Sequence, residues 1–238
     1  MTPGPLAVLG LGFVLGLRHA LDVDHLAAVS TLVNQRRGLW SSSLIGALWG
    51  LGHTAALLAA GVAVIALHAK IPPGLELMLE LGVAAMLVGL GLNVLWKLWQ
   101  GGTTHVHAHE HGGRPHLHLH LHDTGPRPVD GHHHAVRAGR RPFLVGVVHG
   151  FAGSAALMLA VLATIPSPAL AVAYILVFGF GSVVGMALMS TVIGLPLALA
   201  ARRFARVEQA VRVISGVTSV TIGLVLAWEI GTASGFFG

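Results

Sequence analysis

Six long runs of apolar residues, separated by shorter polar or turn-forming segments, dominate the pattern of this chain. The runs lie near residues 6–33, 43–67, 75–99, 142–165, 168–200 and 208–230. Each run can cross a bilayer, because a hydrocarbon core of about 30 Å requires a helix of roughly 20 residues. The pattern therefore predicts an all-α, polytopic membrane protein with six transmembrane helices.

The connections divide the predicted helices into two groups of three. Short turns rich in glycine, proline and serine separate the helices within each group, whereas residues 100–141 form a long polar connection. We expect Pro196 to break the fifth helix near its end. The predicted units are a first three-helix repeat over 1–99, a loop over 100–141 and a second three-helix repeat over 142–238.

The composition agrees with a membrane protein and excludes chemistry that depends on cysteine. Only 10% of the 238 residues are charged, whereas a soluble domain carries about 25%. The chain has no cysteine, which excludes disulfides, Cys-based zinc sites and thiol redox chemistry. Although the isoelectric point is about 11.1, we expect a lipid bilayer and not nucleic acid as the partner. The reason is that the basic residues gather in the connections on one side.

The distribution of lysine and arginine predicts the orientation. Leaving out Arg18, which lies inside an apolar run, the side opposite the long loop carries only Lys70. The loop side carries Arg36, Arg37, Lys97, Arg114, Arg127, Arg137, Arg140, Arg141, Arg202, Arg203, Arg206 and Arg212. Because basic loops stay cytoplasmic, we expect a multi-pass protein of a prokaryotic cell (inner) membrane. Both termini would face outward and the long loop would be cytoplasmic. The first helix lacks a basic leader, so we expect it to be retained.

An internal repeat relates the two halves. Gly16-Leu17-Arg18-His19 aligns with Gly146-Val147-Val148-His149, Gly50-Leu51-Gly52-His53 with Gly179-Phe180-Gly181-Ser182, and Gly82-Val83 and Gly89-Leu90 with Gly216-Val217 and Gly223-Leu224. The matches occur in the same order at offsets of 129 to 134 positions. Three helices per half would place the second half inverted in the membrane. Many secondary transporters have this architecture, with their site at the repeat interface.

The first apolar run contains a cluster of polar residues, Arg18-His19-Ala20-Leu21-Asp22-Val23-Asp24-His25. A charged side chain at the bilayer centre costs roughly 2.5–3.5 kcal/mol on insertion scales, so such residues are usually functional. Imidazole nitrogen and carboxylate oxygen are also ligands for first-row divalent metals. The cluster therefore predicts a metal site that includes His19, Asp22, Asp24 and His25. The alternative is a buried ion-pair network that only ties helices together.

Two arrangements of this cluster are possible. On an ideal helix, His19, Asp22 and His25 share one face. Asp24 would then point elsewhere, either fixing an imidazole tautomer or pairing with Arg18. Alternatively the helix is unwound here and all four residues converge, as in discontinuous transporter helices.

Two further histidines lie inside other predicted helices. His53 and His149 sit among small residues, so that a neighbouring helix or an ion can approach closely. We predict both as additional metal ligands. The alternative for each is a structural histidine that is hydrogen-bonded within the helix bundle.

The long loop carries a second metal signal. The histidines at 105–111 and at 116–122 alternate with other residues, which would align the imidazoles along one side of an extended segment, and three consecutive histidines follow at 132–134. We predict metal binding by His105, His107, His109, His111, His116, His118, His120, His122, His132, His133 and His134. Because this segment cannot build a core, we expect it to be disordered without metal.

These motifs resemble those of the nickel/cobalt transporter family. Residues Arg18 to His25 are similar to its RHA-x-D-A-D-H signature, and Leu51-Gly52-His53-Thr54 is similar to its L-G-H-[ST] motif. The acidic motifs of the longer eight-span members are replaced here by Phe151-Ala152-Gly153-Ser154-Ala155-Ala156 and Ser190-Thr191-Val192-Ile193-Gly194. The chain therefore resembles the short six-helix branch, which includes urease-associated nickel permeases and His-rich-loop efflux proteins.

The resemblance implies a gradient-driven permease for Ni²⁺, or else Co²⁺, as transported substrate, with His19, Asp24 and His25 essential and His53 supporting. It favours import over efflux, with a cytoplasmic nickel chaperone as the candidate recipient and no prosthetic group. Protonation of the ligands would favour release of the ion.

Two other functions are alternatives to transport. An intramembrane zinc-dependent hydrolase would hold stoichiometric zinc, although the chain has no HExxH motif. A metal buffer or sensor without transport would bind metal through the loop alone.

Overall fold

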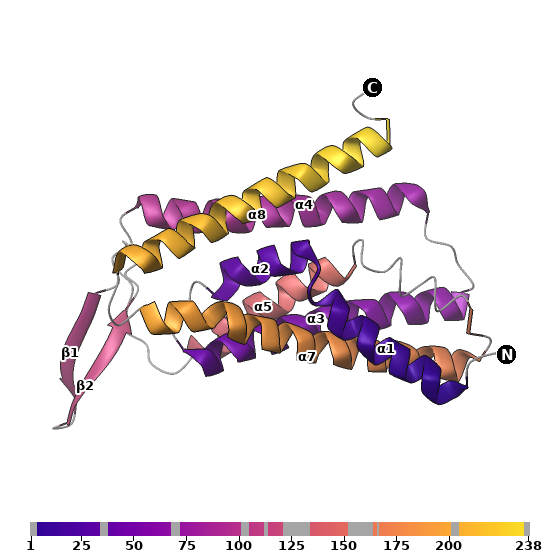
Figure 1. Ribbon diagram of the computed structural model, residues 1–238, viewed down its shortest axis with the longest axis horizontal. Helices are drawn as coiled ribbons and strands as arrows, with labels where there is room; N and C mark the ends of the chain where they lie inside the picture. Colours follow the sequence, from indigo (N-terminus) through magenta and orange to yellow (C-terminus); the bar gives the residue numbers. More distant parts are fainter. Residues whose placement is uncertain are drawn as a thin grey trace.

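The computed structural model describes residues 4–33, 38–67, 72–100, 105–111, 114–120, 134–151, 164–165, 167–200 and 205–235 (Figure 1). Most of these residues are helical. The helices are α1 (Pro5–His19), α2 (Val23–Val33), α3 (Leu39–Leu67), α4 (Pro73–Trp99), α5 (His134–Gly150), α7 (Pro168–Ala200) and α8 (Ala205–Ala233). Two strands, β1 (His105–His111) and β2 (Arg114–His120), form an antiparallel hairpin.

Within the described residues, four helices are long and apolar enough to cross a membrane, namely α3, α4, α7 and α8. Helices α1 and α2 make a fifth candidate if they count as one span, and they are bent by 57° at the break between them. The predicted fourth span, 142–165, falls partly on α5 and partly on residues that the structure leaves undescribed. The protein is thus a polytopic helical membrane protein, with up to five candidate spans among the described residues.

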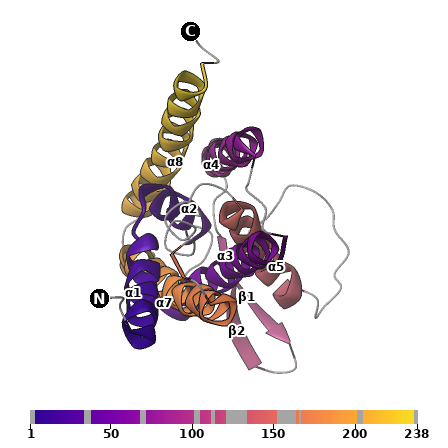
Figure 2. The same ribbon diagram turned by 90° about the vertical axis from the view of Figure 1, so that its right-hand side faces the viewer.

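The helices form two layers with the short α2 between them. Helices α4 and α8 lie side by side on one side of α2, and α1, α3, α5 and α7 lie on the other (Figures 1 and 2). The hairpin lies at one end of the elongated molecule, called here the hairpin end. Helix α1 begins and α8 ends at the opposite end, called here the terminal end (Figure 1).

Glycines allow the backbones of α1, α3, α5 and α7 to approach one another closely. A Cβ at Gly16 of α1 would collide with the carbonyl oxygen of Phe178 in α7, and a Cβ at Gly52 of α3 would collide with that of Phe143 in α5. Between α1 and α7, the Ser182 hydroxyl also donates a 3.3 Å hydrogen bond to the Gly16 carbonyl. Small residues are the usual means of tight packing between membrane helices, since lipid gives little hydrophobic drive for association.

Helices α4 and α8 pack against each other in the same way. A Cβ at Gly91 of α4 would lie 2.5 Å from the carbonyl oxygen of Gly216 in α8. The buried Ser219 hydroxyl of α8 donates a 2.8 Å hydrogen bond to the Leu87 carbonyl of α4. The two helices therefore pack as one antiparallel pair.

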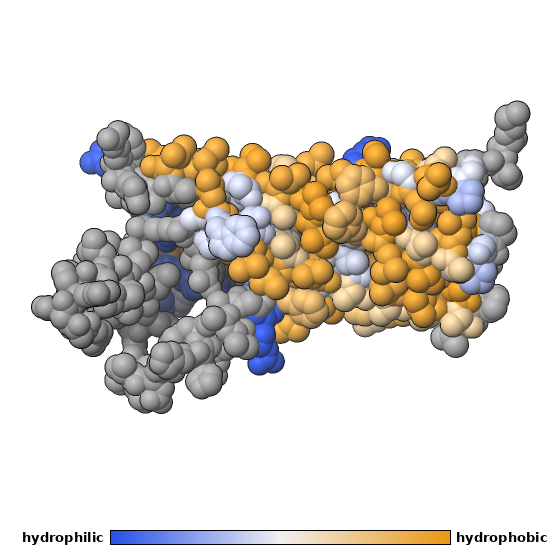
Figure 3. All heavy atoms as spheres, turned by 90° about the horizontal axis from the view of Figure 1, so that it is seen from below, coloured by the Kyte–Doolittle hydropathy of each residue, from blue (hydrophilic) through white to orange (hydrophobic). Residues whose placement is uncertain are grey.

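A broad band of apolar side chains covers the middle of the molecule on the face seen in Figure 3. Many large apolar side chains of the long helices are exposed, among them Met78, Leu188, Val192 and Trp228 at 57–72%. A soluble protein rarely exposes contiguous apolar patches of this extent. The band is the surface expected of a protein surrounded by lipid.

Three local expectations from the sequence differ from the structure. Helix α7 continues through Pro196 to Ala200, because membrane helices tolerate proline where neighbouring groups satisfy the freed backbone carbonyl. Helix α5 begins at His134, inside the segment assigned to the loop. Residues 105–111 and 114–120 form paired strands in place of the expected disorder, with His105, His107 and His109 opposite His120, His118 and His116.

Candidate metal centre

The centre is built around the break between α1 and α2. Helix α1 ends in a tight turn, in which the amides of Leu21 and Asp22 donate to the carbonyls of Arg18 and His19. Helix α2 begins when the Leu26 amide donates to the Asp22 carbonyl at 3.0 Å. The continuous helix that would place His19, Asp22 and His25 on one face is therefore wrong. The alternative arrangement, an unwound segment, is the one observed.

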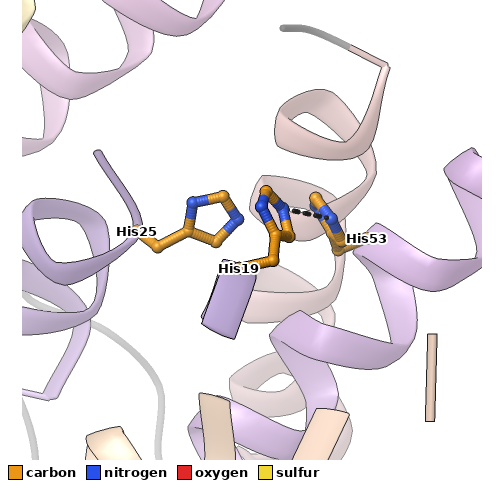
Figure 4. A group of neighbouring side chains, drawn as sticks. All are labelled: His19, His25 and His53. Atoms are coloured by element: carbon orange, nitrogen blue, oxygen red, sulfur yellow. Dashed lines mark hydrogen bonds between the residues drawn. The ribbon is translucent and has the colours of Figure 1, made fainter. Parts of the chain in front are cut away.

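Four histidines from four helices meet at this break. His19 ends α1, His25 lies in the first turn of α2, and His53 and His149 come from α3 and α5. Their exposed fractions are 7%, 0%, 0% and 1%. The centroid of the His25 ring lies 4.3 Å from that of His19, 5.2 Å from that of His53 and 4.2 Å from that of His149. Figure 4 shows the His19 ring lying between those of His25 and His53.

Asp24 fixes the tautomers of two of these histidines. Its Oδ1 accepts hydrogen bonds from the backbone amide and Nδ1 of His25, at 2.9 and 3.0 Å, and its Oδ2 accepts one from His149 Nε2 at 2.9 Å. Because an ionised carboxylate only accepts, each imidazole carries its proton on the nitrogen that faces Asp24. The lone pairs are then on His25 Nε2 and His149 Nδ1, and both atoms are buried without a partner among the described residues.

Asp22 fixes the tautomer of His19 in the same way, and through His19 that of His53. It stands just before α2, and its Oδ2 accepts a 2.7 Å hydrogen bond from Nδ1 of His19. The lone pair on His19 Nε2 faces His53 Nε2 at 3.2 Å, which makes His53 the donor. The lone pair of His53 is then on Nδ1, which is also buried and unpartnered among the described residues.

The arrangement provides two overlapping sets of metal ligands. Ligand atoms of His19, His25 and His53 lie within 4.8 Å of one another, and so do those of Asp24, His25 and His149. His25 belongs to both sets. Neutral imidazole nitrogens oriented by carboxylates are a common design of transition-metal sites. The centre can thus hold a divalent ion in the middle of the molecule, where the helices break.

The loop histidines are separate from this centre. Those in the hairpin lie at the hairpin end, away from the α1–α2 break (Figure 1), and His134 is the first residue of α5. The predicted ligands His122, His132 and His133 lie outside the described residues. The structure therefore brings together His19, Asp22, Asp24, His25, His53 and His149, and it places none of the described loop histidines with them.

Sequence reasoning missed two aromatic residues that line the centre. The Trp49 ring lies 5.2 Å from the His25 ring and 5.6 Å from the His149 ring, and the Phe178 ring lies 5.6 Å from the His19 ring. The internal repeat contained the signal. Trp49 and Phe178 each stand one helical turn before a matched position of the alignment, His53 and Ser182 respectively.

A family model described as high-affinity nickel-transport protein, NicO, matches residues 6–233. The chain belongs to this family. A urease accessory protein, UreH, from Bacillus sp. (strain TB-90) is 38% identical over 232 residues, which are 98% of this chain and 95% of that protein. The Arabidopsis thaliana protein called chloroplast protein FOR GROWTH AND FERTILITY 2 is 26% identical over 95% of this chain but only 56% of its own length. No solved structure matches.

Membership in the NicO family decides between the classes of function considered above. The protein is a metal transporter and not an enzyme, so the alternative of an intramembrane zinc hydrolase is wrong. The polar cluster, the histidines of α3 and α5 and the apolar helices all lie within the matched residues. The centre at the α1–α2 break is thus the natural candidate for the transport site.

Proposed function

We propose that this protein imports Ni²⁺ across the membrane and binds it at the α1–α2 break. The ligands are His19, His25, His53 and His149, with Asp22 and Asp24 orienting them. The observation that carries the proposal is a buried cluster of four imidazoles, in which His25 Nε2, His53 Nδ1 and His149 Nδ1 have no partner among the described residues. An orphaned polar atom in a membrane interior is costly, and a free imidazole lone pair is a ligand for a divalent cation.

The internal repeat supports transport by alternating access. His19 and His149 are matched positions of the internal repeat, and α1 and α5 end at or just after them, at His19 and Gly150. The glycine contacts match as well. Gly16 faces the Phe178 carbonyl, while its counterpart Gly146 faces the Trp49 carbonyl.

A second pair of glycine contacts follows the same rule. Gly52 of α3 faces the carbonyl of Phe143 in α5, and its counterpart Gly181 of α7 faces that of Phe13 in α1. The α1–α7 contact and the α3–α5 contact are therefore built from corresponding residues. We propose that α1 to α4 form one repeat and that α5, α7 and α8 belong to the other, with six spans in total. The ion then lies between the repeats, as in other transporters with inverted repeats.

The centre also suggests how the ion enters and leaves. The Asp22 side chain is 51% exposed, although it is bonded to the buried His19. A half-exposed carboxylate at this depth favours a water-filled approach, because charged groups inside membranes face cavities or partners. Asp22 would attract the cation, and the histidines would bind it. Since protons compete with metal for imidazole nitrogen, acidification on the receiving side would favour release.

The direction and orientation complete the proposal. The basic residues on the loop side support an orientation with the hairpin end in the cytoplasm and both termini outside. Import is the direction favoured by the resemblance to urease-associated nickel permeases. The hairpin histidines would then receive the ion and pass it to a cytoplasmic nickel chaperone. Co²⁺ is the alternative cargo, because the same ligands bind it and only geometry separates the two ions.

The test is flux of radioactive Ni²⁺ in proteoliposomes, with and without a pH gradient, using the full chain and the His25→Ala variant. Ser219→Ala is the matched control, because it also removes a buried polar group but lies in the α4–α8 contact. We expect flux from the parent and the control that responds to the gradient, and none from His25→Ala. Ni²⁺ binding without flux in a folded parent protein would overturn the proposal in favour of metal storage.

A further inference from the structure

The metal centre is flanked by two aromatic side chains, one from each half of the internal repeat. Trp49 of α3 and Phe178 of α7 are 1% and 2% exposed. The Trp49 ring contacts His25 and His149, and the Phe178 ring contacts His19. The two residues approach different members of the cluster.

The direction of the helices shows which side each ring covers. Helix α3 runs from the hairpin end toward the terminal end, and α7 runs the opposite way (Figure 1). Trp49 precedes His53 by one helical turn, about 6 Å along the axis, and therefore lies on the hairpin side of it. Phe178 precedes Ser182 by one turn and lies on the terminal side.

The two rings are also fixed by corresponding backbone contacts. A Cβ at Gly146 would lie 2.9 Å from Cδ1 of Trp49 and collide with its carbonyl, and a Cβ at Gly16 would collide with the carbonyl of Phe178. In both places a glycine one turn before a histidine of the centre allows the aromatic residue to come close. Neither ring is held by a hydrogen bond, since Phe178 has no polar atom and the buried indole nitrogen of Trp49 has no partner among the described residues.

We propose that Trp49 and Phe178 are the two gates of the transport site, Trp49 toward the hairpin end and Phe178 toward the terminal end. This inference rests on the proposed function and deepens it. Each ring separates the histidine cluster from one side of the membrane. Because apolar and unpartnered contacts hold them, each ring can swing away without breaking a polar network. Alternating access then requires that only one of the two moves at a time.

The chain offers a clean way to test the gates, because it contains no cysteine. A single reporter, Ser182→Cys, places a thiol at a fully buried position one turn beyond Phe178 and opposite Gly16. A charged, membrane-impermeant thiol reagent is added to right-side-out or inside-out vesicles without metal. The rate of modification then measures water access to the centre from each side.

We expect Trp49→Ala to raise the modification rate severalfold from the hairpin side only, and Phe178→Ala to raise it severalfold from the terminal side only. Trp49→Phe should stay close to the parent, because it keeps an aromatic ring. Phe180→Ala is the control, since Phe180 lies on the same helix but is 62% exposed. If an alanine variant does not fold, leucine at the same position retains part of the bulk and gives the same comparison.

An equal increase from both sides would overturn the proposal, because it would show loosened packing and not a gate. An unchanged rate in folded Trp49→Ala and Phe178→Ala proteins would also overturn it. The measurement uses no metal and no flux. If the protein failed to transport Ni²⁺ but showed side-specific labelling, the proposal of two gates would therefore stand and the proposed function would fall.

Discussion

The Asp24 carboxylate accepts a hydrogen bond of 2.9 Å from Nε2 of His149, a residue 125 positions later in the chain. The same carboxylate holds His25. One side chain thus orients two imidazoles from different halves of the protein and leaves a lone pair on each. This places Asp24 behind the histidines, as the residue that sets their tautomers.

The first prediction concerns this carboxylate. Asp24→Asn keeps the shape of the side chain but replaces one acceptor with an NH₂ donor, so that it cannot fix both imidazoles. We expect Ni²⁺ affinity to fall by roughly 10–100-fold, the usual cost of losing a group that orients metal ligands. Calorimetric titration should use protein whose hairpin histidines are replaced, so that loop binding does not mask the effect. Asp22→Asn should cost less, because Asp22 is 51% exposed. Parent-like affinity in Asp24→Asn would contradict this role.

The second prediction ranks two histidines. His25 belongs to both sets of ligand atoms, whereas His149 belongs to one. We therefore expect His25→Ala to weaken Ni²⁺ binding more than His149→Ala, which leaves His19, His25 and His53 in place. Equilibrium dialysis of the two variants against the parent measures the order. The reverse order would mean that the ion is centred on Asp24 and α5 and not on His25.

The third prediction concerns stability. Gly52→Ala places a methyl group against the Phe143 carbonyl, and Gly181→Ala places one against the Phe13 carbonyl. Each should destabilise the protein by about 1–3 kcal/mol, the typical cost of overpacking. Gly82→Ala is the matched control, because nothing lies within 4 Å of a Cβ there. Thermal unfolding in detergent measures all three. Unchanged melting of both test variants would show that these contacts relax without cost.

Much of the fold followed from hydrophobic length alone. The predicted runs 75–99 and 168–200 correspond closely to α4 (Pro73–Trp99) and α7 (Pro168–Ala200), because a bilayer imposes a minimum length on apolar helices. The break at Ala20 to Asp22 did not follow from length, since the apolar run continues on both sides. It depends on tertiary contacts, in which Asp22 bonds back to His19 and Asp24 reaches His149.

The site was predictable only in part for the same reason. Residue chemistry alone selected His19, Asp22, Asp24 and His25, because ionisable groups are expensive in a membrane. The position of Trp49 against His25 had no such signal, since tryptophan is common in apolar helices. Only the correspondence of Trp49 with Phe178 in the repeat, read together with the packing of Gly146 and Gly16, makes their shared role visible.

The fourth prediction separates the loop from the centre. Replacing the hairpin histidines, from His105 to His120, with serine should lower the number of Ni²⁺ ions bound per chain. His25-dependent flux should remain, because the hairpin lies at one end of the molecule and the centre lies at the α1–α2 break (Figure 1). The number of bound ions and the flux are measured on the same preparation. Loss of flux together with unchanged binding by the helices would show that the hairpin takes part in each transport cycle.

The last prediction concerns orientation in the membrane. Helix α1 begins and α8 ends at the terminal end, opposite the hairpin (Figure 1), and the basic residues gather on the hairpin side. In the cysteine-free chain, Ala108→Cys in the hairpin should react with an impermeant thiol reagent only in inside-out vesicles. Ser234→Cys, just after α8, should react only in right-side-out vesicles. Labelling of both cysteines from the same side would require an even number of crossings between them, and with it a repeat of unequal halves. If each cysteine reacted only from the side opposite to the expected one, the protein would have the reverse orientation in the membrane. The hairpin would then gather the ion outside the cell.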